Sequence, residues 1–232
     1  MRRILFVALL AAATVLGQQN DQRTTKLVHL KYVDPEALRA IVSQFGVNVV
    51  PNSSMKVMTL SGLPPQIAAA EAAIQQLDVA PKDIELVVHF VVGSDQANLV
   101  GSPIPSDIRD VISQLKSTFT FKDYRMLDVL TLRSRAGSSA ETTGILDSRQ
   151  SPPRLTLFSV RNTSVSEDGA TIRIDRMHAG LRIPTGGQKP EYVNTGIDQD
   201  IDVKAGQKVV VGRASLEGPE KALFLILTAR VM

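Results

Sequence analysis

Two hydrophobic periodicities divide this chain and restrict it to a mixed helical part followed by a part made almost only of strands. From Lys26 to Asp78 the apolar positions switch between a period of two and a period near 3.6, which predicts the order β-α-β-β-α. Beyond Asp83, short alternating runs recur between turn residues, and only residues 106–119 have helical spacing. The predicted class is α+β: a two-layer β-α-β-β-α module, then a mainly β sandwich or partly open barrel with one helix.

The first module, residues 21–80, is predicted to pack two helices on a three-stranded sheet. Its strands are expected at residues 26–32, 47–50 and 55–61. Asp34 suits the N-cap of the first helix, and Gly46 is placed to end it. The apolar positions at helical spacing predict the buried helix faces, which are Leu38, Ile41, Val42 and Phe45 on the first helix and Ile67, Ala70, Ile74 and Leu77 on the second.

The second module, residues 83–232, is predicted to be rich in strands. A polar loop is expected over Gly137–Thr143, and the single helix over residues 106–119. The strands are expected at residues 84–92, 124–135, 155–160, 171–183, 197–203, 208–212 and 222–231. Strands at this spacing, separated by turn residues, favour a sandwich or a partly open barrel.

The first 17 residues have the order of a cleavable secretory signal. Arg2 and Arg3 precede an apolar run from Ile4 to Leu16, and the small residue Gly17 precedes a polar stretch. The apolar run is shorter than the roughly 20 residues that a helix needs to span a bilayer. We therefore expect residues 1–17 to be a signal peptide and the mature chain to have no integral membrane span. The expected location is the periplasm or the medium, with outer-membrane association as a variant.

Composition excludes several kinds of partner and site. The chain has no cysteine, which excludes disulfides and thiolate metal sites. Its formal net charge of +3 includes Arg2 and Arg3, so the mature chain would carry about +1. A charge so close to neutral gives no support for a nucleic-acid partner. The KH-like order of elements also lacks the Gly-x-x-Gly loop with which KH domains clamp RNA.

No constellation of catalytic or metal-binding residues stands out. His29, His89 and His178 each lack a carboxylate or second histidine at ligand spacing in the sequence. Asp198, Asp200 and Asp202 resemble a calcium loop, but the positions that should hold glycine and glutamate do not, and their period of two fits the exposed face of an edge strand. There is no nucleophile elbow and no phosphate-binding loop. We predict a protein that is not an enzyme, with no catalytic, cofactor or metal residues.

Two predicted strands carry clusters of arginine. Their simplest interpretation is a solvated sheet face, and the alternative is a docking surface for an acidic partner. The residues are Arg125, Arg133 and Arg135 on one strand and Arg173, Arg176 and Arg182 on another.

The stretch from Lys26 to Val92 resembles the N-domains of bacterial secretins, the proteins of type II and III secretion systems and type IV pili. The carrying segments are Val28–Leu38, Val57–Gly62, Ala70–Asp78 and Ile84–Val88. They match the family's order of strand, helix, two strands, a helix ending in Leu-Asp, and a strand that opens the next domain. The segments Ala205–Gly212 and Ala222–Val231 are similar to the final strands of a secretin core.

This resemblance implies an interaction module, because secretin N-domains pack side by side into rings and receive partner proteins. A secretin also has a gate and a lip of amphipathic hairpins, and neither is recognisable between Val92 and Gly206. The function we predict is a non-enzymatic, exported assembly module in protein secretion or pilus machinery. Its expected partners are envelope or secretion-system proteins, or copies of itself in a homo-oligomer or ring. The alternatives are an exported β-sandwich that binds a small ligand or envelope polymer, and a true outer-membrane channel.

Overall fold

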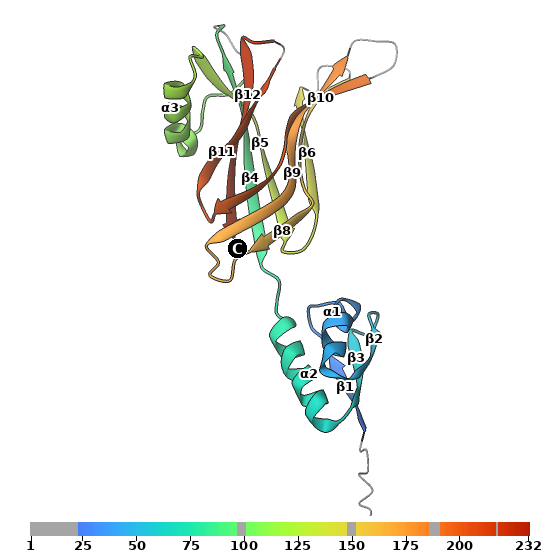
Figure 1. Ribbon diagram of the computed structural model, residues 1–232. Coiled ribbons are helices and arrows are strands. Elements are labelled where there is room, and N and C mark those ends of the chain that lie inside the picture. Colours follow the sequence, from blue (N-terminus) through green and yellow to red (C-terminus); the bar gives the residue numbers. More distant parts are fainter. Residues whose placement is uncertain (1–22, 97–100, 148–151, 186–190, 217) are drawn as a thin grey trace, which may run out of the picture. The chain divides into compact units, whose positions relative to one another are not determined.

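The computed structural model describes residues 23–96, 101–147, 152–185, 191–216 and 218–232. The chain divides between Ala80 and Pro81 into two compact units (Figure 1). We call residues 23–80 the N-domain and residues 81–232 the β-domain. The predicted signal peptide, residues 1–17, lies outside the described residues.

The N-domain has two helices and a three-stranded antiparallel sheet. The sheet order is β1-β3-β2, and both helices contribute to one core with the sheet (Figure 1). Leu38, Val42 and Ile74 from the helices meet Met58 and Leu60 of the central strand in that core. In chain order the elements are β1 (Thr24–His29), α1 (Pro35–Val42), η1 (Ser43–Phe45), β2 (Asn48–Asn52), β3 (Val57–Gly62) and α2 (Pro64–Leu77).

The rotation of the helices differs from the sequence prediction at three positions. Leu38 and Val42 are buried on α1, whereas Ile41 is 43% exposed. Pro35, Leu38 and Val42 define the inward stripe, and at about 100° per residue Ile41 lies well to one side of it. Phe45 is exposed because the last turn is the 3₁₀ helix η1, whose tighter winding displaces it from the stripe.

Leu77 is the third of these residues. Ile67, Ala70 and Ile74 on α2 are buried as predicted, but Leu77 is 38% exposed. It is the last residue of α2, and the chain leaves the helix at Asp78. The prediction that Leu77 belongs to the core is therefore wrong.

The β-domain consists of two sheets and one helical segment. The four-stranded sheet has the order β11-β12-β4-β5, and the second sheet has the order β10-β9-β7-β6 with β8 paired to β9. The elements are β4 (Asp83–Ser94), η2 (Ser106–Ile108), α3 (Arg109–Thr118), β5 (Asp123–Arg135), β6 (Ala140–Asp147), β7 (Arg154–Val160), β8 (Asn162–Val165), β9 (Thr171–Thr185), β10 (Glu191–Lys204), β11 (Lys208–Ser215) and β12 (Lys221–Val231).

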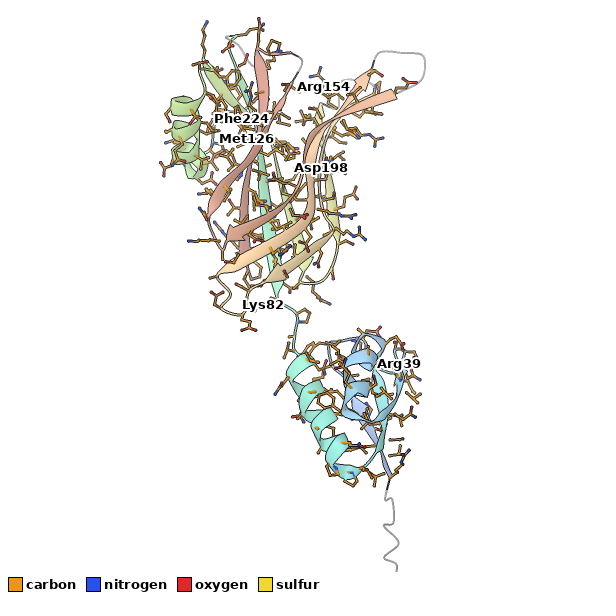
Figure 2. The ribbon with its side chains drawn as sticks, in the orientation of Figure 1. Arg39, Lys82, Met126, Arg154, Asp198 and Phe224 are labelled. Atoms are coloured by element: carbon orange, nitrogen blue, oxygen red, sulfur yellow. The ribbon has the colours of Figure 1, made fainter. Side chains whose placement is uncertain are left out.

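In the centre of the four-stranded sheet, β12 from Ala222 to Ala229 and β4 from Val88 to Ser94 are buried on both faces. Their alternate residues, including Phe90 and Leu225, face the second sheet in the main core. The other residues, including Phe224, face α3 in a separate core that also holds Met126 (Figure 2). The predicted α+β class is confirmed.

Three features of the β-domain depart from the prediction. Residues 140–143, expected in a polar loop, belong to β6, where Thr142 and Thr143 pair with β7. The segment expected as one helix over 106–119 begins as the 3₁₀ turn η2 and continues as α3. Two long hairpins, β6–β7 and β9–β10, occupy the region between Val92 and Gly206 in which the sequence reveals none.

Candidate docking surface

Exposed apolar side chains are concentrated in the N-domain. Of the thirteen large hydrophobic residues that are exposed in the described parts of the chain, nine lie in this smaller unit. They are Leu27, Tyr32, Ile41, Phe45, Val50, Met55, Leu63, Leu77 and Val79. Since such patches on a small domain mark places where another molecule binds, the N-domain is the first place to look for a site.

Two of these residues form a patch on the sheet. Leu27 and Val50 both pair with Thr59 of the central strand, one from each side. Directly paired residues point to the same face, so the three side chains make a row across the sheet. Leu27 is 53% exposed and Val50 is 57% exposed, because the helices cover the other face. We call Leu27 and Val50 the sheet patch.

A second patch lies on the helical layer. Ile41 of α1 and Phe45 of η1 are four residues apart and are both exposed. We call these two residues the helix patch. The N-domain therefore presents apolar groups on both of its layers, an arrangement that allows one copy to contact the next in a head-to-tail manner.

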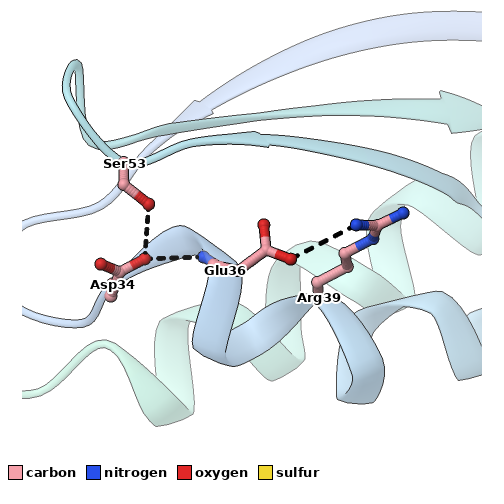
Figure 3. A network of polar contacts seen from close by, with 4 residues as sticks. All are labelled: Asp34, Glu36, Arg39 and Ser53. Atoms are coloured by element: carbon pink, nitrogen blue, oxygen red, sulfur yellow. Dashed lines mark hydrogen bonds and ion pairs between the residues drawn. The ribbon is translucent and has the colours of Figure 1, made fainter.

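A polar clasp joins the loop after β1 to the turn between β2 and β3 (Figure 3). The Asp34 carboxylate accepts a hydrogen bond from the Glu36 backbone N–H at 2.8 Å, as an N-cap should, and another from the Ser53 hydroxyl at 2.7 Å. These two hydrogen bonds hold the pKa of the Asp34 carboxyl below its usual value, and the one from Ser53 contributes most. Glu36 also pairs with Arg39 at 3.3 Å on the exposed helix surface. The clasp holds two of the loops that surround the core.

Asp78, at the C-terminal end of α2, binds the same loop from the other side. Its carboxylate accepts hydrogen bonds from the backbone N–H groups of Lys31, Tyr32 and Val33 at 2.7, 2.8 and 3.0 Å. Burial acts to raise the pKa of this carboxyl, but the three donors together outweigh it, and the pKa lies below the usual value. Of the Leu-Asp pair at the end of the helix, Leu77 therefore lies outside the core, and Asp78 fixes the β1–α1 loop through its hydrogen bonds.

The three histidines lie apart from one another. His29 is exposed on β1. His89 is buried on β4 with its Nε2 atom 3.7 Å from the carboxylate of Asp107, and burial lowers the pKa of its imidazole although Asp107 acts in the opposite sense. The His178 Nδ1 atom lies 2.6 Å from the carboxylate of Asp198. Sequence spacing missed both carboxylates. Pairing of β9 with β10 brings Asp198 to His178, 20 positions away, and Asp107 reaches His89 from η2.

Several charged residues of the hairpin β9–β10 have partners on their own or the neighbouring strand. Asp198, Asp200 and Asp202 are exposed on the edge strand β10, as their spacing predicts. Arg173 pairs with Asp175 at 3.0 Å, and Arg182 lies over the ring of Tyr192. On β5 the predicted arginines are paired as well, Arg125 with Asp123, Arg133 with Glu85 and Arg135 with Asp83. Only Arg176 of the six has no such partner among the described residues.

Within the described ranges, no three acidic or histidine side chains gather as metal ligands. Over the same residues, the helices are too short or too polar to cross a membrane.

One family model matches part of the chain. The model of the bacterial type II/III secretion system short domain, Secretin_N, matches residues 25–83, which is the N-domain and the start of β4. A comparison with curated proteins gives no match.

Solved secretins share the fold of the chain. The type II secretin GspD from enteropathogenic Escherichia coli superposes with a TM-score of 0.59 at 11% identity, over 90% of this chain and 87% of that one. The type IV competence pilus secretin PilQ from V. cholerae gives 0.58 at 12% identity, over 94% and 79%. The type III injectisome secretin InvG from Salmonella gives 0.54 at 14%, over 90% and 87%.

These relatives confirm the resemblance that the sequence shows. Members of the family are structural components of secretion channels and not enzymes, which agrees with the predicted absence of an activity. Residues 25–83 thus match the secretin N-domain family, and the fold of the chain is similar to that of solved secretins.

Proposed function

We propose that this protein is an exported assembly module that docks through its N-domain to copies of itself or to another component of a secretion or pilus machine. The observation that carries this proposal is the density of exposed apolar residues on the N-domain, arranged as a sheet patch and a helix patch on different layers. A sheet patch on one copy that meets a helix patch on the next makes a heterologous contact, which closes into a ring when the rotation between copies is right.

Such a contact is small. An interface between two N-domains of this size falls at the low end of stable protein interfaces, so association of the purified chain should be weak and should rise with concentration. In the envelope, a partner already arranged as a ring would supply the missing stability by holding many copies close together.

Charge on the sheet patch should abolish this association. The variant Leu27→Glu/Val50→Glu puts two carboxylates into the proposed contact, where desolvation opposes binding. Sedimentation velocity over a concentration series should show oligomers for the wild-type chain and only monomers for the variant. Ile145→Glu, which changes a 63% exposed residue of the β-domain, is the matched control and should leave the oligomers unchanged. Equal loss in both variants, or in neither, would remove the sheet patch from the interface.

A channel-forming role is the second candidate. It is favoured by the two long hairpins of the β-domain and by the secretin fold over 90% of the chain. Stepwise conductance of the purified chain in planar bilayers would support this role, and its absence would favour docking alone.

A further inference from the structure

One pocket of the β-domain contains cationic groups that make no ion pair or side-chain hydrogen bond with the described residues. It has a volume of about 370 Å³ and is lined by Ser139, Ala140, Glu141, Ser159, Val160, Arg161 and Arg176. It lies where β6 begins and β7 ends, beside the bulge of β9. We call it the arginine pocket.

The two guanidinium groups of the arginine pocket stand out from the other arginines of the hairpins. Arg173 and Arg182, on the same strand as Arg176, are held by Asp175 and Tyr192. Within the described parts of the chain, Arg161 and Arg176 form neither an ion pair nor a side-chain hydrogen bond. The hydroxyls of Ser139 and Ser159 are also without a hydrogen bond to the described residues. The pocket therefore offers two fork-shaped donors and two hydroxyls to a ligand.

The backbone at Arg176 is strained. Its φ angle is +48°, in the left-handed region that residues with a Cβ rarely adopt. The pairing of β9 with β10 passes from Met177–Gln199 to Ile174–Ile201, so Asp175 and Arg176 together oppose the single residue Asp200. The Asp200 carboxylate fixes this bulge by accepting a hydrogen bond from the Arg176 backbone N–H at 2.6 Å.

The effect of the bulge is to direct the guanidinium. A bulge breaks the alternation of side chains along a strand and turns one of them in a new direction. Met177 remains in the core, and Arg176 lines the pocket beside Arg161. A strained backbone beside a pocket points to a role for the side chain at that position, here Arg176.

We infer that the arginine pocket binds a carboxylate of an acidic segment of a partner protein. Arginine matches the two oxygens of a carboxylate with paired N–H donors. The lining of two arginines and one glutamate carries a formal charge of +1, which suits the single charge of a carboxylate better than the nearly double charge of a phosphate. That the carboxylate belongs to a protein rests on the docking role proposed above. The pocket is in the β-domain, so its binding can be measured separately from association of the N-domain.

The test is a titration of the full chain with a glutamate tetrapeptide, acetylated and amidated at its ends, followed by amide NMR shifts. We expect saturable shifts at residues 139–141 and 159–161, weakened by added salt. The glutamine tetrapeptide should bind at least tenfold more weakly. Equal binding of the two peptides, or the absence of saturable shifts, would overturn the inference. Tighter binding of inorganic phosphate than of the glutamate peptide, at equal ionic strength, would make this a phosphate site and would overturn it as well.

The variant Arg176→Gly separates binding from folding. Glycine adopts a φ of +48° without strain, so this variant should unfold at the same or a higher denaturant concentration while it loses the guanidinium. We expect the glutamate peptide to bind it at least tenfold more weakly. Arg230→Gln, which removes an exposed arginine of β12 outside the pocket, is the control and should bind within about twofold of wild type. Unchanged binding by Arg176→Gly would contradict the assignment.

Discussion

Replacing Ile74 with alanine should lower the free energy of unfolding of the N-domain by about 2–5 kcal/mol, whereas the same change at Leu77 should cost less than about 1 kcal/mol. Ile74 is 2% exposed in the core between α2 and the sheet, and its truncation leaves a cavity that the neighbouring side chains fill only in part. Leu77, three residues further along the same helix, is 38% exposed and leaves no cavity.

The measurement is native-state hydrogen exchange of the full chain, read at the amides of α2 and β3. Because the chain has two units, a single global melting curve would mix their transitions, and exchange reports on the N-domain alone. Equal costs at the two positions would mean that α2 is rotated relative to the arrangement described above.

Replacing Asp78 with asparagine should destabilise the N-domain by about 2 kcal/mol at neutral pH. The amide can accept hydrogen bonds only through its oxygen, and its NH₂ group faces N–H donors in place of the second carboxylate oxygen. Glu36→Gln changes an exposed carboxylate that pairs only with Arg39, and should cost less than about 0.5 kcal/mol.

The cost of Asp78→Asn should depend on pH. The pKa of the Asp78 carboxyl is lower in the folded chain than the value near 3.9 of an unfolded one, so the carboxylate stabilises the fold fully above that value. This stabilisation is lost as the pH falls through the folded pKa. Urea unfolding followed by the same amides should therefore show a difference between wild type and variant at pH 7 that shrinks at lower pH. A difference that is independent of pH would show that the charge of Asp78 is not the cause.

Local patterns in the sequence identify most of the N-domain, since every element there is marked by a periodicity or a cap. Asp34, Gly46 and the Leu38 position are examples of such local signals. The patterns do not determine how each helix is rotated about its axis relative to the sheet to better than about a third of a turn. Ile41 and Val42 are neighbours with equally apolar side chains, and only the position of the sheet decides which of them is buried.

The β-domain is harder to predict because its pairing is long-range. Residues 140–143 are small and polar, so they have the composition of a loop, yet pairing with β7 makes them a strand. The contact between His178 and Asp198 and the pocket beside Arg176 depend on the register and the bulge of the hairpin β9–β10. Neither the register nor the bulge has a signature in the order of residues alone.

The resemblance to secretins predicted features of the chain that the periodicities alone did not. It identified the Leu-Asp end of α2 and the strand that opens the next domain, which the family model and the fold both support. It did not reveal the hairpins, because β6 has the composition of a loop and the pairing of the predicted strands 155–160, 171–183 and 197–203 has no local signal. The fold similarity shows that this part of the chain shares the secretin architecture as well.

Docking through the N-domain is tested most directly by cross-linking in the cell envelope, with the full chain and with a chain from which residues 21–80 are deleted. If the N-domain is the docking module, the full chain should form cross-linked complexes, and the deletion should abolish them while the β-domain stays folded. Complexes that persist unchanged without residues 21–80 would contradict the proposal and would assign the docking role to the β-domain.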